Sequence, residues 1–104
     1  MAVKIKYCGL RHESEIELAC QLGIDAIGLV FVEKSPRHVS LERAEILSQH
    51  LKQSNAKHKP LLVALFVNPD AAFVRQVIKE VRPDVLQFHG QETVEFCQQF
   101  SLPY

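Results

Sequence analysis

Residues 26–32 read AIGLVFV, a run of seven positions without a polar side chain. Residues 61–67, LLVALFV, repeat this pattern farther along the chain. Short apolar runs of this kind are typical of strands that are buried on both faces, as in a parallel sheet covered by helices. A parallel pair needs a crossover between its strands, so the two runs predict βα units, and these units decide the fold.

Amphipathic segments alternate with the apolar runs. Four helices are predicted. The first spans residues 13–22, the second residues 41–52 and the fourth residues 92–100. The third is capped and opened by Asn68-Pro69, and Pro83 ends it. Gly23 is a plausible C-terminal stop of the first helix, and Ser40 is the expected N-cap of the second. In the third, Val74, Val77, Ile78 and Val81 follow the i, i+3, i+4, i+7 spacing of a buried helix face.

Two further strands are predicted over residues 3–8 and 85–89. The complete order is βαβαβαβα, which indicates a parallel α/β sheet. The polar connection 33–40, EKSPRHVS, is unusually long and follows a strand, where α/β folds build their sites.

Composition excludes several classes of function. The 104 residues are 47% apolar, and 12 basic residues balance 12 acidic ones, which gives no electrostatic case for nucleic acid or a membrane surface. No apolar run approaches the ~20 residues of a transmembrane helix, and no signal peptide is recognisable. The three cysteines, Cys8, Cys20 and Cys97, form no C-x-x-C pair and suit a reducing cytoplasm, which is the expected location. No dinucleotide or Walker motif is present.

The alternation of side chains along two strands places polar groups at the same end of the predicted sheet, the mouth formed by the carboxyl ends of its strands. In residues 3–8 the apolar positions should meet the helices, which turns Cys8 toward the interior at the carboxyl end of the strand. In residues 85–89 the same argument turns Gln87 and His89 inward. Active sites of (βα)8 barrels lie at this end of the strands.

Each candidate residue has a plain structural alternative. A strand cysteine such as Cys8 is usually an inert small hydrophobe, although the following Gly9 would let a ligand approach the backbone. Arg37 is either a solvated loop residue or a planar fork for a carboxylate or phosphate. His89 is either hydrogen-bonded structure or, with Gln87, part of a polar pocket.

Five segments together resemble one family. They are residues 6–10 (KYCGL), 23–31 (GIDAIGLVF), 35–40 (SPRHVS), 63–68 (VALFVN) and 87–90 (QFHG). In this order and spacing they are similar to the motifs of the phosphoribosylanthranilate isomerases, an enzyme family of tryptophan biosynthesis. The resemblance covers essentially the whole chain.

The resemblance implies a (βα)8 TIM barrel and an Amadori rearrangement of N-(5-phosphoribosyl)anthranilate to 1-(2-carboxyphenylamino)-1-deoxyribulose 5-phosphate, without a cofactor or metal. It makes Cys8 the general base that removes the C2 proton of the ribose. It assigns Arg37 to substrate binding, most plausibly of the anthranilate carboxylate. Gln87 and His89 would line the pocket, and Gly9 would allow close approach of the substrate.

Two departures from the family pattern affect these expectations. Arg11 stands where the family has Thr, which leaves the cap of the first helix open. Residues 1–104 correspond to the first four βα units of a single barrel domain, so the family's general acid and phosphate loops have no counterpart. We therefore expect the chain alone to be inactive, and we expect its open half barrel to self-associate.

Two alternatives remain from the sequence. One is another phosphosugar barrel, such as a pentose-phosphate epimerase or an indole-glycerol-phosphate synthase, which would need inward metal ligands or a lysine acid pair. The other is a non-catalytic four-unit α/β module such as a receiver-like domain. That module needs acidic residues after its first strand and an aspartate at the end of its third, whereas Cys8-Gly9 and Asn68-Pro69 stand at these places.

Overall fold

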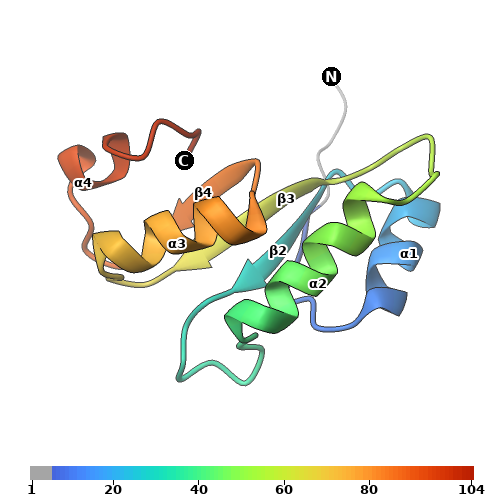
Figure 1. The fold of residues 1–104 in the computed structure, drawn as a ribbon, viewed down its shortest axis with the longest axis horizontal. Helices are drawn as coiled ribbons and strands as arrows, with labels where there is room; N and C mark the ends of the chain where they lie inside the picture. Colours follow the sequence, from blue (N-terminus) through green and yellow to red (C-terminus); the bar gives the residue numbers. More distant parts are fainter. Residues whose placement is uncertain (1–5) are drawn as a thin grey trace.

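The computed structural model describes residues 6–104, in which four strands and four helices alternate. In chain order the elements are β1 (Lys6–Cys8), α1 (Glu13–Leu22), β2 (Ala26–Val30), α2 (Leu41–Lys52), β3 (Leu61–Phe66), α3 (Ala71–Val81), β4 (Val85–Phe88) and α4 (Val94–Gln98). All strand pairs are parallel, and the sheet order β1-β2-β3-β4 follows the sequence. Figure 1 shows the helices arranged in the same order from one end of the sheet to the other. The predicted alternation and parallel sheet are confirmed, while residues 3–5 of the first predicted strand lie outside the described part.

The first two helices have the bounds that their caps predict. Gly23 ends α1 in the left-handed conformation, with φ 69°, and its N–H donates to the carbonyls of Ala19 and Cys20. Ser40 caps α2 by accepting a hydrogen bond of 3.1 Å from the backbone N–H of Arg43.

The predicted start of the third helix at Asn68-Pro69 is wrong. Asn68 has a positive φ of 45°, and its side-chain oxygen accepts a hydrogen bond of 2.7 Å from the backbone of Gln91. Its own N–H donates to the Glu92 carboxylate at 2.6 Å. Because Asn68 is engaged by the loop after β4, α3 begins only at Ala71, with Asp70 as its N-cap.

The fourth helix is shorter than predicted at both ends, because it runs from Val94 to Gln98 rather than from Glu92 to Phe100. Thr93 is its N-cap and accepts a hydrogen bond of 3.1 Å from the N–H of Phe96. Glu92 lies before the helix, where its carboxylate accepts from the N–H groups of Asn68 and Gly90.

The later three strands also end one or two residues before the predicted positions. The ladder nevertheless continues beyond β2 and β4, since the N–H groups of Phe31 and His89 donate to carbonyls of β3 at 2.9 Å each. His89 therefore remains held to the sheet although it is no longer part of the strand.

The main hydrophobic core lies between the sheet and the helices. Phe66 of β3 is fully buried and stacks between Phe31 and Phe88, with ring centroids 5.5 and 5.7 Å apart. Burying such a side chain contributes about 1.5–3 kcal/mol, and each aromatic pair adds about 0.5–1.5 kcal/mol. The remaining strand residues of this face are Ile27, Leu29, Leu62, Ala64 and Leu86.

The opposite face of the sheet is apolar in its centre as well. Val30, Val63 and Leu65 are buried there, at 5%, 5% and 8% exposure, yet they do not belong to the helix-facing cluster. Strands with buried residues on both faces agree with the continuous apolar runs of the sequence.

The two edges of the sheet differ. Along β1 and α1, Tyr7, Leu18 and Leu22 remain about half exposed and border an apolar hollow of 160 Å³. At β4 the N–H of Leu86 donates to the carbonyl of Pro103 at 2.8 Å, so the chain after α4 runs beside β4 where a further strand would add. Within residues 6–104 no helix is long and apolar enough to span a bilayer.

Candidate active site

Cys8 lies on the inner face of the sheet, at the carboxyl end of β1. It pairs in register with Gly28 of β2, and a Cβ placed on Gly28 would lie only 2.9 Å from the Cys8 sulfur. The thiol therefore occupies space that glycine leaves free on the neighbouring strand, and it remains half-buried rather than enclosed. Gly28 is a site residue that the sequence analysis did not single out, although a glycine inside an apolar strand is a signal of close approach.

Gly9 and Arg37 meet directly above the strand ends. Gly9 is buried and has a φ of 92°, and a Cβ on it would overlap the side chain of Arg37. The Arg37 guanidinium donates a hydrogen bond of 3.0 Å from Nη1 to the backbone oxygen of Cys8. The close approach that Gly9 permits in this structure is therefore that of Arg37, and it brings the predicted base and the predicted substrate-binding arginine together.

A second arginine makes the reverse connection. Arg11, in the loop after β1, donates from Nη1 to the backbone oxygen of Pro36 at 3.1 Å. Ser35 accepts a hydrogen bond of 3.1 Å from the N–H of Arg37, which tightens the turn. Two guanidinium groups thus join these segments. Arg11, in the loop after β1, donates to the loop after β2, and Arg37, in the loop after β2, donates to the end of β1.

Gln87 and His89 are also in contact. The side-chain nitrogen of Gln87 lies 2.6 Å from Nε2 of His89, and its oxygen accepts a hydrogen bond from the Lys6 ammonium. Because the ammonium occupies the Gln87 oxygen, the amide nitrogen is the donor to His89, and Nε2 of the imidazole is the acceptor. Lys6 belongs to β1, so this chain of hydrogen bonds crosses the inner face between strands that are not neighbours.

The loops after β3 and β4 are joined as closely as the first two. Besides the contacts of Asn68, Glu92 accepts a hydrogen bond of 2.8 Å from the N–H of Gly90. A Cβ on Gly90 would lie within 2.8 Å of the Asn68 backbone nitrogen. Asn68 and Glu92 therefore fix the mouth on the side of β4, and neither role follows from a local sequence pattern.

Glu15 anchors the loop after β1 from below. Its carboxylate accepts hydrogen bonds of 3.0 Å from the N–H groups of Arg11 and His12, and one of 2.8 Å from the Tyr7 hydroxyl. Burial alone would raise the pKa of Glu15, but these three hydrogen bonds outweigh it and lower the pKa below the ordinary value. The hydrogen bond to Glu15, together with its negative charge, raises the pKa of Tyr7.

A hollow of 690 Å³ lies between the loops after β2 and β3, and its lining includes Phe31, Glu33, His38, Asn68, Asp70 and Phe73. It contains none of Cys8, Arg37 and His89. Cys8, Gln87 and His89 lie on the inner face of the sheet, apart from this hollow, so volume does not identify the candidate site. In residues 6–104 no three Cys, His, Asp or Glu side chains form a cluster that could hold a metal ion.

Parallel βα units in sequential order, with polar side chains gathered at the carboxyl ends of the strands, define part of a TIM-barrel enzyme. The comparisons with known proteins specify the enzyme family. The sequence pattern described as N-(5'-phosphoribosyl)anthranilate (PRA) isomerase matches residues 5–103, and the chain belongs to this family. This result removes both alternatives that the sequence had left open.

Relatives agree in name and in fold. The N-(5'-phosphoribosyl)anthranilate isomerase of Legionella pneumophila (strain Corby) is 43% identical over 98% of this chain, and that of Xanthomonas oryzae pv. oryzae is 43% identical over 97%. A crystal structure of monomers generated from the dimeric isomerase of Thermotoga maritima superposes with a TM-score of 0.85 at 29% identity and covers 96% of this chain. A second structure of the family, in complex with reduced 1-(o-carboxyphenylamino)-1-deoxyribulose 5-phosphate, gives a TM-score of 0.81 at 29% identity.

The matches share one limit of length. The chain spans 47% of the Legionella relative and 49% of each of these two solved chains. It therefore corresponds to about half of the proteins that it resembles.

Proposed function

We propose that the protein of which these residues form one half converts N-(5'-phosphoribosyl)anthranilate into 1-(2-carboxyphenylamino)-1-deoxyribulose 5-phosphate, an aldose–ketose isomerisation of tryptophan biosynthesis. The observation that carries the proposal is the family match over residues 5–103. The direct contact between Arg37 and the backbone of Cys8 supports it, because the contact joins a candidate base to a candidate anion-binding group. A reducing location such as the cytoplasm is part of the proposal, supported by three free cysteines.

Cys8 is the proposed general base. The rearrangement requires removal of the proton at C2 of the ribose after the furanose ring has opened, and a thiolate at the end of a strand is able to accept it. Its half-buried position on the inner face leaves the sulfur accessible from the side where substrate would lie. The glycine at position 28 keeps this sulfur clear of the neighbouring strand.

Arg37 is the proposed ligand of the anthranilate carboxylate. A guanidinium carries five N–H donors, and the hydrogen bond to the Cys8 carbonyl uses only one nitrogen. The remaining donors are available for a bidentate pair with a carboxylate. Binding through a side chain that also holds the Cys8 backbone would place the substrate in a defined position relative to the thiol.

Gln87, His89 and Gly9 complete the proposed pocket. The Gln87–His89 pair presents polar groups on the inner face beside β4, opposite to Cys8 on β1. Gly9 contributes by leaving space for the Arg37 side chain. The proposed reaction transfers protons within one substrate, so these residues need no cofactor or metal beside them.

The test of this assignment compares cysteines in a full-length protein that contains the chain. Cys8→Ala should lower kcat by about 10²–10⁴-fold, the usual contribution of a general base. Cys20→Ala is the matched control, because Cys20 lies on α1, packed against the helix-facing core and away from the inner face. A Cys8→Ala protein that retains kcat within threefold would exclude the proposed role.

We further propose that residues 1–104 are the first half of a single barrel domain, and that the isolated chain self-associates through its exposed apolar surface. Tyr7, Leu18 and Leu22 leave an apolar strip exposed beside β1, at one edge of the sheet. Exposed apolar surface at a strand edge favours association. The isolated chain should be essentially inactive and should sediment as a concentration-dependent oligomer, and a clean active monomer would contradict both statements.

A further inference from the structure

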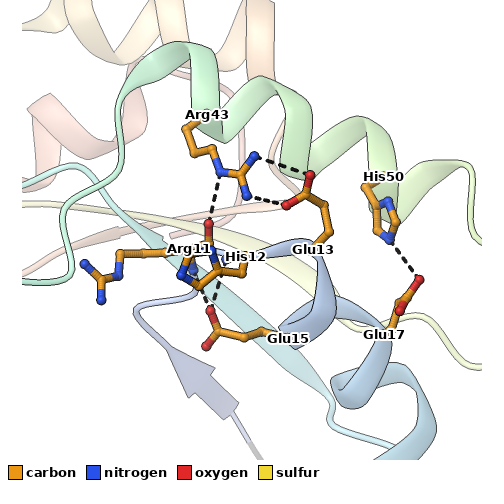
Figure 2. Close-up of polar contacts among 7 residues, drawn as sticks. All are labelled: Arg11, His12, Glu13, Glu15, Glu17, Arg43 and His50. Atoms are coloured by element: carbon orange, nitrogen blue, oxygen red, sulfur yellow. Dashed lines mark hydrogen bonds and ion pairs between the residues drawn. The ribbon is translucent and has the colours of Figure 1, made fainter.

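The backbone of Arg11 is held more firmly than an exposed loop residue requires. Its carbonyl oxygen accepts a hydrogen bond of 3.1 Å from Nε of Arg43, a residue of α2. Its N–H donates to Glu15 of α1 at 3.0 Å. Arg43 is itself paired with Glu13, so two helices fix the loop after β1 at one residue (Figure 2).

The side chain of Arg11 leaves this cluster. In Figure 2 its guanidinium extends away from Arg43, Glu13 and Glu15. It ends at the carbonyl of Pro36, the residue directly before Arg37. Because its backbone is fixed by two helices, the hydrogen bond of its side chain can hold the Pro36 carbonyl in a defined position.

We infer that Arg11 is a positioning residue for Arg37. Its hydrogen bond to the Pro36 carbonyl fixes the loop that carries Arg37, which in turn points its guanidinium at the Cys8 carbonyl. The inference rests on the proposed function, in which Arg37 binds the substrate carboxylate. Arg11 itself does not touch the substrate in this scheme.

The physical advantage is a smaller ordering cost on binding. Arg37 is exposed, and a free arginine side chain loses rotamer entropy when a ligand orders it. In this chain the cost is met before the ligand arrives, since Arg37 is held through Cys8, Ser35 and, by way of Pro36, Arg11. Removing Arg11 should therefore weaken carboxylate binding and leave the proton transfer at Cys8 largely unchanged.

The experiment uses a full-length protein that contains the chain, with isotope-labelled arginine, observed by NMR. In the wild type, the Arg37 guanidinium should show hindered rotation about its Nε–Cζ bond, because Nη1 is engaged with the Cys8 carbonyl. Arg11→Met should speed this rotation, and Arg11→Lys should partly restore it, since an ammonium can also donate to the Pro36 carbonyl. Arg75→Met is the matched control, because Arg75 lies on α3 and contacts Gln99 and Phe100 instead.

Titration with anthranilate supplies the second readout. Its dissociation constant should rise about fivefold in Arg11→Met, equivalent to about 1 kcal/mol, and remain within twofold in Arg75→Met. In turnover assays of the same protein the change should appear in KM with kcat retained. Amide spectra of every variant verify that the fold is intact.

Each outcome bears on a different statement. Faster rotation of Arg37 in Arg11→Met, with no anthranilate binding by any variant, would support the positioning role and contradict the carboxylate assignment. Anthranilate binding and Arg37 rotation that are the same in wild type and Arg11→Met would overturn the inference. An equal effect of Arg75→Met would overturn it as well, because the response would then be general.

Discussion

The contact between Cys8 and Gly28 makes a quantitative prediction. In a Gly28→Ala variant the new Cβ would lie 2.9 Å from the Cys8 sulfur but 3.5 Å from its Cα and Cβ, which are ordinary contacts. Only the sulfur is therefore in the way. Overpacking of this kind costs about 1–3 kcal/mol, and the low end applies because the thiol is half-buried and can rotate.

A second contribution has the opposite sign. Gly28 has no positive φ, so alanine fits its backbone, and the loss of freedom in the unfolded chain should stabilise the protein by about 0.4–1 kcal/mol. Gly28→Ala should thus cost about 0.5 kcal/mol in the wild type, because the overpacking cost of about 1 kcal/mol is partly offset. In a Cys8→Ala background, which lacks the sulfur, it should instead stabilise by about 0.5 kcal/mol. The coupling between the two positions is then about 1 kcal/mol.

Urea unfolding of the four proteins at one concentration measures this coupling. Gly23→Ala is a suitable control, because Gly23 has a φ of 69° with no atom near its Cβ position. Its cost of about 1–2 kcal/mol should be the same with and without the Cys8 sulfur. If Gly28→Ala stabilises both backgrounds equally, the thiol does not lie over Gly28, and the inward orientation of Cys8 fails with it.

Two further predictions concern the loops. Because the pKa of Glu15 is lowered in the folded chain, its carboxylate stabilises the fold above the ordinary pKa near 4.5, and the contribution disappears as the pH falls through the folded value. The difference in unfolding free energy between wild type and Glu15→Gln should shrink toward acid pH in urea titrations, and a constant difference would contradict this. Asn68→Ala should cost about 2–4 kcal/mol, since it combines a positive φ with a lost acceptor, and Asn68→Gly should cost less because glycine tolerates the backbone. Equal thermal stability of these two variants would exclude the backbone contribution.

Local chemistry explains what the sequence predicted correctly. The bounds of α1 and α2 follow from Gly23 and Ser40, whose capping depends on residues one turn away. The inward orientation of Cys8 follows from strict alternation along a strand, which needs no knowledge of other elements. The family resemblance, confirmed over residues 5–103, rests on motifs that these local rules place at the mouth.

The misses depend on contacts between distant segments. The local sequence around Asn68 is typical of a helix cap. Only its hydrogen bonds with Gln91 and Glu92 show that Asn68 connects the loops after β3 and β4. Glu92 is drawn out of α4 for the same reason. The contacts of Arg11 could not be predicted either, because its partners Pro36 and Arg43 belong to other segments. The roles of Cys8, Arg37, Gln87 and His89 in catalysis remain predictions.

The hydrogen bond from Lys6 to Gln87 has a consequence for how such a domain is assembled. It spans β1 and β4, so the sheet is already curled when only four strands are present. Each strand also pairs with its immediate predecessor, so this curl can develop progressively as the polypeptide leaves the ribosome. In the proposed complete barrel, the remaining strands would then add to a sheet that is already curved.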